Sequence, residues 1–206
     1  MTAAAPDGSG QARGRPRDPR TDAAIMAAAR RLLTEVGYDQ VSMESIARAA
    51  GVSRPTVYRR WPSKAHVVFE AAFGTAGSTA LAASTGDFET DLREFARGAV
   101  QFWREPVVAA AAMGILADRR RDPALQIRTQ QLLDDKIRAE LAALIRGAAA
   151  HGVVRPDVDT DLLFDTLVGT AFYGALVDGR NADQLADKLC SLMLQGVRPR
   201  QDREPR

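Results

Sequence analysis

The stretch from residue 50 to residue 64 reads AGVSRPTVYRRWPSK. Gly51 can adopt the left-handed backbone conformation that a tight turn requires, and Ser53 is a residue type that favours the N-cap of a helix. Pro55 is harmless in a first helical turn, because the amides there have no intrahelical partner to lose. The pattern predicts a tight turn followed by a short helix over residues 54–60.

The two sides of this short helix differ in chemistry. Val57 points inward, and Trp61, one turn later, packs below it. The positions that remain outside are Arg54, Pro55, Thr56, Tyr58 and Arg59. Arginine can pair with a guanine edge or a phosphate, threonine can contact a thymine methyl group, and tyrosine can reach a phosphate oxygen. These side chains suit DNA, although which of them reads bases stays open, and ordinary solvated residues are the alternative interpretation.

Two further helices are expected before the turn. Residues 21–37 carry apolar side chains at intervals of three and four, and Gly37 supplies the stop. Ser42 can cap a second short helix. The apolar faces of these two helices consist of Ile25, Ala28, Ala29, Leu32, Leu33 and Val36, and of Met43, Ile46, Ala47 and Ala50. Three short helices with such a connection predict a helix-turn-helix, which presents its second helix to the DNA major groove.

Residues that flank the third helix are also candidates for DNA contact. Lys64 lies in the first turn of an expected fourth helix, where the helix dipole disfavours a cation and a nearby phosphate would reverse that effect. Ser42 begins the second helix, whose free amides can face a phosphate, although plain N-capping explains this serine at least as well. Ser53, at the start of the third helix, is a further candidate for DNA contact.

Residues 25–73 resemble the TetR family of bacterial regulators. The resemblance rests on AARRLL at 28–33, on GY at 37–38 followed by VSMESIA at 41–47, and above all on the 50–64 block. Pro55 stands where this family frequently has glycine, and Trp61 where it frequently has phenylalanine. Strong motifs cover about a quarter of the chain, and the remainder matches only as a helical layout of suitable length.

The resemblance implies an all-α protein of about nine helices. A three-helix DNA-binding domain would be followed by an all-helical domain that binds a ligand and forms a homodimer. The expected layout is a flexible basic arm at 1–20, the helix-turn-helix domain at 21–66, the ligand-binding and dimerisation domain at 67–197, and a flexible tail at 198–206. Repression of a palindromic operator, relieved by a small-molecule effector, is the usual outcome in this family, but the residues do not decide between repression and activation.

Basic charge is concentrated at the N-terminal end. Residues 1–64 hold eleven Lys or Arg and six Asp or Glu, whereas the rest of the chain holds seventeen and twenty. Residues 1–20 offer almost nothing to bury, and their RGRPR segment resembles arms that some TetR proteins insert into the DNA minor groove. Arg15 and Arg17 are therefore candidates for DNA contact, and a disordered extension without that role is the alternative.

After a Gly/Ser/Thr-rich patch, the sequence predicts helices near 88–104, 107–120, 123–151, 160–177 and 182–194. The resemblance places a dimer interface on the last two, where the candidates are Leu167, Ala171, Gly174, Leu185, Leu189 and Leu192. An ordinary monomer core is the alternative for these six. Apolar or amphipathic residues that we expect near a ligand cavity are Phe102, Trp103, Met113, Leu116, Leu133, Phe172 and Tyr173.

Other classes of protein have little support in the sequence. The chain has two histidines and one cysteine, and it lacks a nucleophile motif, a glycine-rich phosphate loop and a metal-ligand cluster. We therefore expect no catalytic residue, no metal and no cofactor. Neither a signal segment nor an apolar run of about 20 residues is present, so no membrane contact and a cytoplasmic location are expected. A nonspecific architectural DNA-binding protein and, less favoured, a helical enzyme remain as alternatives.

Overall fold

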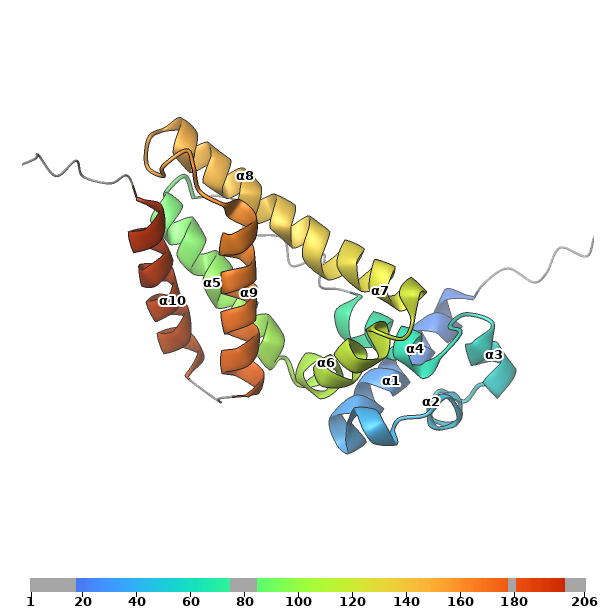
Figure 1. Cartoon of the computed structure of the whole chain (residues 1–206). Coiled ribbons are helices and arrows are strands. Elements are labelled where there is room, and N and C mark those ends of the chain that lie inside the picture. The colour runs from blue at the N-terminus through green and yellow to red at the C-terminus, as the bar shows by residue number, and fades with distance from the viewer. Residues whose placement is uncertain (1–17, 75–84, 178–180, 199–206) are drawn as a thin grey trace, which may run out of the picture.

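The computed structural model describes residues 18–74, 85–177 and 181–198, and every regular element in these ranges is a helix (Figure 1). The helices are α1 (Pro19–Gln40), α2 (Met43–Ala49), α3 (Arg54–Tyr58), α4 (Lys64–Phe73), α5 (Phe88–Arg104), α6 (Pro106–Arg119), α7 (Pro123–Thr129), α8 (Lys136–Ala150), α9 (Thr160–Leu176) and α10 (Ala182–Val197). A π-helical segment, η2 (Gln130–Asp135), joins α7 to α8. Counted as one helix, α7, η2 and α8 bring the described part to nine, which confirms the all-α prediction.

Helix α1 begins two residues earlier than the apolar pattern predicted. Asp18 is its N-cap and accepts a hydrogen bond from the backbone N–H of Arg20 at 3.0 Å, while Pro19 occupies the first turn. Gly37 interrupts the helix with a φ of 75°, as expected, but a further turn follows and ends at Gln40.

The helix-turn-helix forms as the sequence predicted. Gly51 has a φ of 66°, which places the turn between α2 and α3 in the left-handed region that glycine tolerates. Val57 is fully buried, and Trp61 is nearly so. Helix α3 ends at Tyr58, two residues short of the predicted end. Arg60 therefore lies beyond the helix, and its side chain forms an ion pair with Asp22 of α1.

Two hydrophobic cores lie at opposite ends of the molecule (Figure 1). The first joins α1, α2, α3, α4 and α6 with Leu125 of α7, and the second joins α5, α8, α9 and α10. Trp103 of α5 packs against both. Helix α6 therefore lies beyond the predicted domain boundary in sequence but packs with the DNA-binding helices in space.

Gly114 marks a close approach between α6 and the Tyr38 side chain. A Cβ atom at Gly114 would overlap the Tyr38 ring, which is held in place because its hydroxyl donates to Asp118 Oδ2 at 2.5 Å. Overpacking of this kind costs roughly 1–3 kcal/mol, so we expect Gly114→Ala to lower the free energy of unfolding by about that amount in a urea titration.

Gly98 provides the matched control for this substitution. It lies inside α5, and a Cβ there meets nothing within 4 Å. Because alanine favours helix over glycine by roughly 0.5–1 kcal/mol, Gly98→Ala is expected to be neutral or stabilising. Equal stability of the two variants would contradict the packing described for Tyr38.

Candidate nucleic-acid interface and ligand pocket

The outer face of α3 is exposed and bears the predicted side chains. Arg54, Pro55, Tyr58 and Arg59 are exposed, and 43% of Tyr58 is accessible to solvent. The Arg54 guanidinium forms an ion pair with Glu44 of α2 at 2.5 Å and lies 5.4 Å from the centre of the Tyr58 ring. A cation and a phenol are thus held side by side on the surface that α3 would bring to a DNA duplex.

Thr56 is only partly exposed, and its hydroxyl has partners within the motif. Its Oγ1 is 2.8 Å from the Ser53 hydroxyl and accepts a hydrogen bond from Arg59 Nη2 at 3.3 Å. Ser53 occupies the N-cap position but does not cap the helix with its side chain. The three side chains form one polar group at the exposed start of α3.

Ser42 serves as a helix cap. Its Oγ accepts from the Ser45 backbone N–H at 3.0 Å, and its own N–H donates to Ser45 Oγ at 2.9 Å. This reciprocal pair is a capping box, with serine rather than glutamate as its second member. The geometry accounts for Ser42 by folding alone, and its contact with phosphate remains a prediction.

Lys64 has an internal partner that the sequence did not reveal. Its Nζ donates to the backbone oxygen of Tyr38 at 3.0 Å and lies 4.3 Å from the centre of the Tyr38 ring. The carbonyl dipole and the ring face offset the unfavourable dipole of α4 without a phosphate. A structural role therefore explains Lys64, whereas Arg15 and Arg17 lie outside the described residues.

Neutralising Glu44 is expected to strengthen DNA binding. Its own backbone hydrogen bond, and then Arg54, hold the pKa of this carboxyl below its usual value, so it is charged at neutral pH. In Glu44→Gln, Arg54 loses its anionic partner and the surface loses a charge that repels phosphate. We expect a several-fold gain in affinity for every duplex tested, with a steeper salt dependence, in fluorescence anisotropy titrations.

Glu35→Gln is the control for this prediction. Glu35 is an exposed carboxylate on α1 that pairs with Arg31 within the same helix. An equal gain in affinity from Glu35→Gln would show that net charge alone, and not the release of Arg54, explains the result.

Five of the seven residues predicted for a ligand cavity fall into two groups. Phe102, Trp103 and Phe172 form an aromatic cluster, with ring centres 5.1 Å apart for Phe102 and Trp103 and 5.0 Å apart for Trp103 and Phe172. Phe73 of α4 joins this cluster 6.1 Å from Phe102. The cluster links the end of α4 to α5 and α9. Phe102, Trp103 and Phe172 are only partly buried, and their place in the wall of a ligand cavity stays a prediction.

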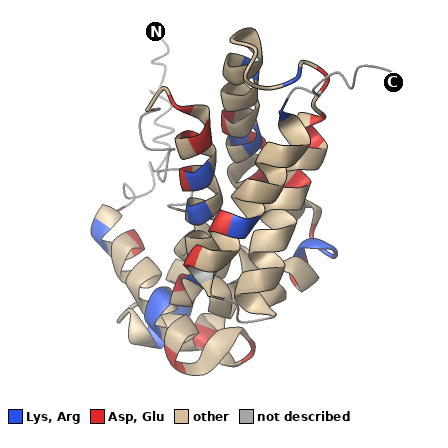
Figure 2. Cartoon of the chain, turned by 90° about the vertical axis from the view of Figure 1, so that its left-hand side faces the viewer, with Lys and Arg blue, Asp and Glu red and all other residues tan. Residues whose placement is uncertain are grey.

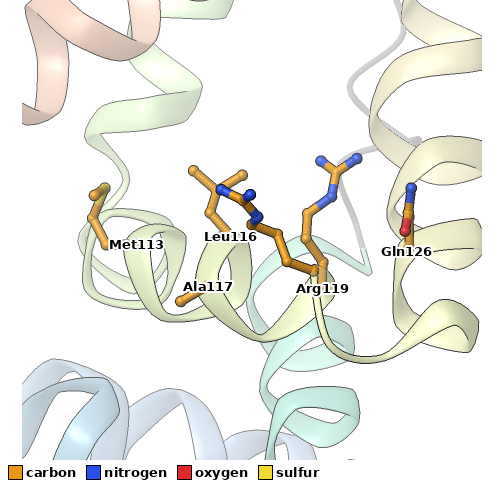
Figure 3. Close-up of a pocket in the computed structure, with 6 residues that line it drawn as sticks. Met113, Leu116, Ala117, Arg119 and Gln126 are labelled. Atoms are coloured by element: carbon orange, nitrogen blue, oxygen red, sulfur yellow. The ribbon is translucent and has the colours of Figure 1, made fainter.

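The second group lies on or near α6. Met113 and Leu116 line a pocket of about 580 Å³ together with Ala117, Arg119, Arg120 and Gln126. Figure 3 shows Met113, Leu116 and Arg119 projecting from α6, with Gln126 on α7 beyond Arg119. Leu133 and Tyr173 do not line this pocket: Leu133 is partly buried against the first core, and Tyr173 is 53% exposed on α9.

Five of the six residues predicted for the dimer interface pack inside the protomer. Leu167, Ala171, Leu185 and Leu189 belong to the second core, and Gly174 is buried against Leu185. Only Leu192 is free, with 64% of it exposed. The packing of α9 and α10 against α5 accounts for these five as protomer core, the alternative named above, and their contact with a second copy stays a prediction.

Other apolar side chains remain uncovered on these two helices. Besides Leu192 of α10, they are Leu162, Tyr173 and Val177. Figure 2, seen from the side of α10, shows long uncharged stretches on the helices of this end. These side chains are candidates for contact with a second copy.

The remaining chemistry of the described residues is sparse. They contain no group of three or more His, Cys, Asp or Glu placed to hold a metal ion. Cys190 is buried, and burial raises the pKa of its thiol, which makes it a poor nucleophile. None of the described helices is long and apolar enough to cross a bilayer.

Comparison with known proteins gives one consistent result. Residues 25–71 match the family model for bacterial regulatory proteins of the tetR family, and residues 82–192 match the tetracyclin repressor-like C-terminal domain. The HTH-type transcriptional regulator YdeS of Bacillus subtilis is 31% identical over 81% of this chain and 84% of its own length. The DNA-binding transcriptional repressor TetR of Mycobacteroides abscessus is 32% identical over 76% of this chain and 89% of its own.

Solved structures share the arrangement of helices. The TetR family transcription regulator SCO0332 superposes with a TM-score of 0.66 at 29% identity, covering 87% of this chain and all of the other. FadR from Thermus thermophilus, solved in complex with lauroyl-CoA, gives a TM-score of 0.68 at 22% identity, covering 90% of this chain and 99% of the other. The second likeness shows the fold alone.

Proposed function

Because this chain belongs to the TetR family of bacterial regulators, we propose that it represses transcription by binding a palindromic operator as a homodimer, and that a small molecule in its C-terminal part releases it. The chain is a DNA-binding transcriptional regulator and not an enzyme. A cytoplasmic location, where the operator lies, is part of the proposal.

The observation that carries the proposal is the outer face of α3. This helix has a buried side at Val57 and an exposed side with Arg54, Tyr58 and Arg59, none of which is needed in the core. The second helix of a helix-turn-helix enters the major groove with such side chains. Arg54 and Thr56 are our candidates for base contact, whereas Tyr58 and Arg59 are candidates for phosphate contact.

Dimerisation is supported by the uncovered apolar residues of α9 and α10. A second copy would cover Leu162, Tyr173 and Leu192 and would place two copies of α3 on one duplex. Two half-sites about one helical turn apart would follow from this symmetry. Release by a small molecule is supported by the pocket on α6, a helix that packs directly on α1 and α4.

Selection of bound fragments from sheared genomic DNA of the source organism tests the proposal. We expect recovery of a fragment with a palindrome, bound at least about 10³ times more tightly than random duplex at the same salt concentration. Equal binding of random duplex would instead indicate a nonspecific architectural protein, and the absence of any binding would contradict the proposal.

A further inference from the structure

Helix α6 contacts the pocket with one face and α1 with another. One face lines the pocket through Met113, Leu116 and Arg120. The other meets α1, because Tyr38 packs on Gly114 and donates a hydrogen bond to Asp118 at 2.5 Å. Whatever occupies the pocket therefore lies one helix away from the DNA-binding domain.

The pocket wall combines exposed apolar side chains with cations. Met113 is 62% exposed and Leu116 is 37% exposed, so both side chains are accessible to the apolar body of a ligand. Arg119 and Arg120 stand beside them, and the wall contains no carboxylate. Within the described residues, neither arginine forms an ion pair. Arg119 lies near Asp134 of η2, where burial raises the pKa of that carboxyl and Arg119 partly opposes the rise, but the two residues form no salt bridge.

We propose that this pocket binds an amphipathic anion, a molecule with an apolar body and a single carboxylate or phosphate head group; this inference rests on the proposed function. Arg119 and Arg120 would hold the head group, since a guanidinium matches these anions with paired hydrogen bonds. Met113 and Leu116 would cover the apolar body, and methionine adapts its shape to different ligands. A volume of about 580 Å³ suits a small molecule of this kind.

Three polar contacts connect α6 and α7 to α1 and α4. Tyr38 of α1 donates to Asp118, which precedes the two arginines in sequence. His66 of α4 lies 3.6 Å from Asp122, the N-cap of α7. Arg128 of α7 pairs with Glu70 at 3.1 Å. An anion bound by Arg119 and Arg120 would pull on the C-terminal end of α6, which carries Asp118. The hydrogen bond between Asp118 and Tyr38 would pass this movement to α1.

The first of these contacts is the best placed to transmit such a shift. Burial and the hydrogen bond to Asp118 both raise the pKa of Tyr38, so its hydroxyl stays protonated and remains a donor over the physiological range. The π-helical segment η2 directly follows α7, and π-helical turns within α-helices are frequent at functional sites. Because Tyr38 contacts Asp118 and does not line the pocket, it is a positioning residue, which acts through Asp118 rather than on the ligand.

Calorimetric titration of the full chain with four probes of equal length tests the ligand class without any DNA. The probes are decanoate, decyl phosphate, decanol and decylammonium, each below its micelle concentration. We expect the two anions to bind at least about tenfold more tightly than decanol, and decylammonium to bind most weakly. The ratio of the affinities for decanoate and decyl phosphate shows whether the pocket prefers a carboxylate or a phosphate head group. Equal affinity for decanoate and decanol, or binding by none of the four, would overturn the proposal.

Substitutions localise the site. Arg119→Gln/Arg120→Gln should lower the affinity for the preferred anion about tenfold or more. Arg121→Gln, the next arginine in the run, does not line the pocket and should leave the affinity unchanged. Equal losses in both variants would reject the assignment. Thermal unfolding of each variant shows whether the fold is intact.

Tyr38→Phe tests the connection to DNA. The variant keeps the ring on Gly114 but loses the hydrogen bond to Asp118. We expect it to bind the anion as the unmodified chain does, while the anion no longer weakens binding to the selected operator fragment. An unchanged anion effect would refute this step. A protein that binds the anion but no DNA fragment would refute the proposed function and leave the pocket assignment standing.

Discussion

Trp61→Ala is expected to lower the free energy of unfolding by about 3–5 kcal/mol, the usual cost of truncating a buried aromatic side chain. Only 6% of Trp61 is exposed, and it belongs to the first core beside the fully buried Val57. Its indole Nε1 also donates to Glu70 Oε2 at 3.0 Å. Because these contacts fix α3 against α4, the variant should also lose operator binding. Urea denaturation followed by circular dichroism measures the first effect, and anisotropy titration the second.

Trp61→Phe separates packing from the hydrogen bond. Phenylalanine retains most of the ring contacts, and Glu70 keeps its ion pair with Arg128 at 3.1 Å. A loss of roughly 0.5–1.5 kcal/mol is expected from the missing hydrogen bond, together with a smaller packing loss. If Trp61→Ala unfolded at the same urea concentration as the unmodified chain, the burial described for this residue would be wrong.

The helices were the part of the fold that the sequence predicted best. Helix α5 has the predicted bounds, and α9 differs from its prediction by one residue at the C-terminal end. Local chemistry explains this accuracy, because Asp87 and Asp159 cap these helices through backbone N–H groups of the first turn. Such signals lie within three residues of the boundary that they specify.

The outer face of α3 could also be predicted, since it follows from assigning Val57 and Trp61 to the core. The internal partners of the neighbouring polar residues could not. Lys64 donates to a carbonyl oxygen 26 residues earlier, and Tyr38 donates to a carboxylate 80 residues later. No pattern along the chain reports such a pair, because it arises only when α1, α4 and α6 pack together.

The sequence also predicted only part of the candidate pocket on α6. Met113 and Leu116 were predicted from their apolar character, but Arg119, Arg120 and Gln126 were not among the candidates. Charged residues at a helix end ordinarily face water, and their spacing here is compatible with that role. Only the turn between α6 and α7 brings Gln126 opposite these side chains.

The spacing of apolar residues was least informative about which side of α9 is buried, because this helix is apolar around much of its circumference. One side, with Leu167 and Ala171, packs inside the protomer, and another, with Leu162 and Tyr173, is exposed. The sequence therefore indicated burial on two sides without showing which side meets the chain's own helices. The exposed side supplies the surface that we assign to the second copy.

Leu192→Glu is expected to convert the proposed dimer into a folded monomer and to weaken operator binding by about 10²- to 10⁴-fold, because two linked DNA-binding domains gain that much from effective concentration. The 64% exposure of Leu192 in the protomer means that glutamate disturbs no internal packing. A charge buried against a second copy without a partner, in contrast, opposes association strongly. Sedimentation velocity reports the oligomeric state, and anisotropy titration reports the affinity for the operator fragment.

Ile127→Glu is the matched control, because Ile127 of α7 is similarly exposed at 59% but lies on neither α9 nor α10. This variant should remain a dimer and bind the operator with little change, so that a general effect of added negative charge can be separated from loss of the interface. A dimeric Leu192→Glu protein would show that the second copy does not cover this face. A monomeric Leu192→Glu protein with undiminished operator affinity would show instead that the two α3 helices do not act together on one duplex.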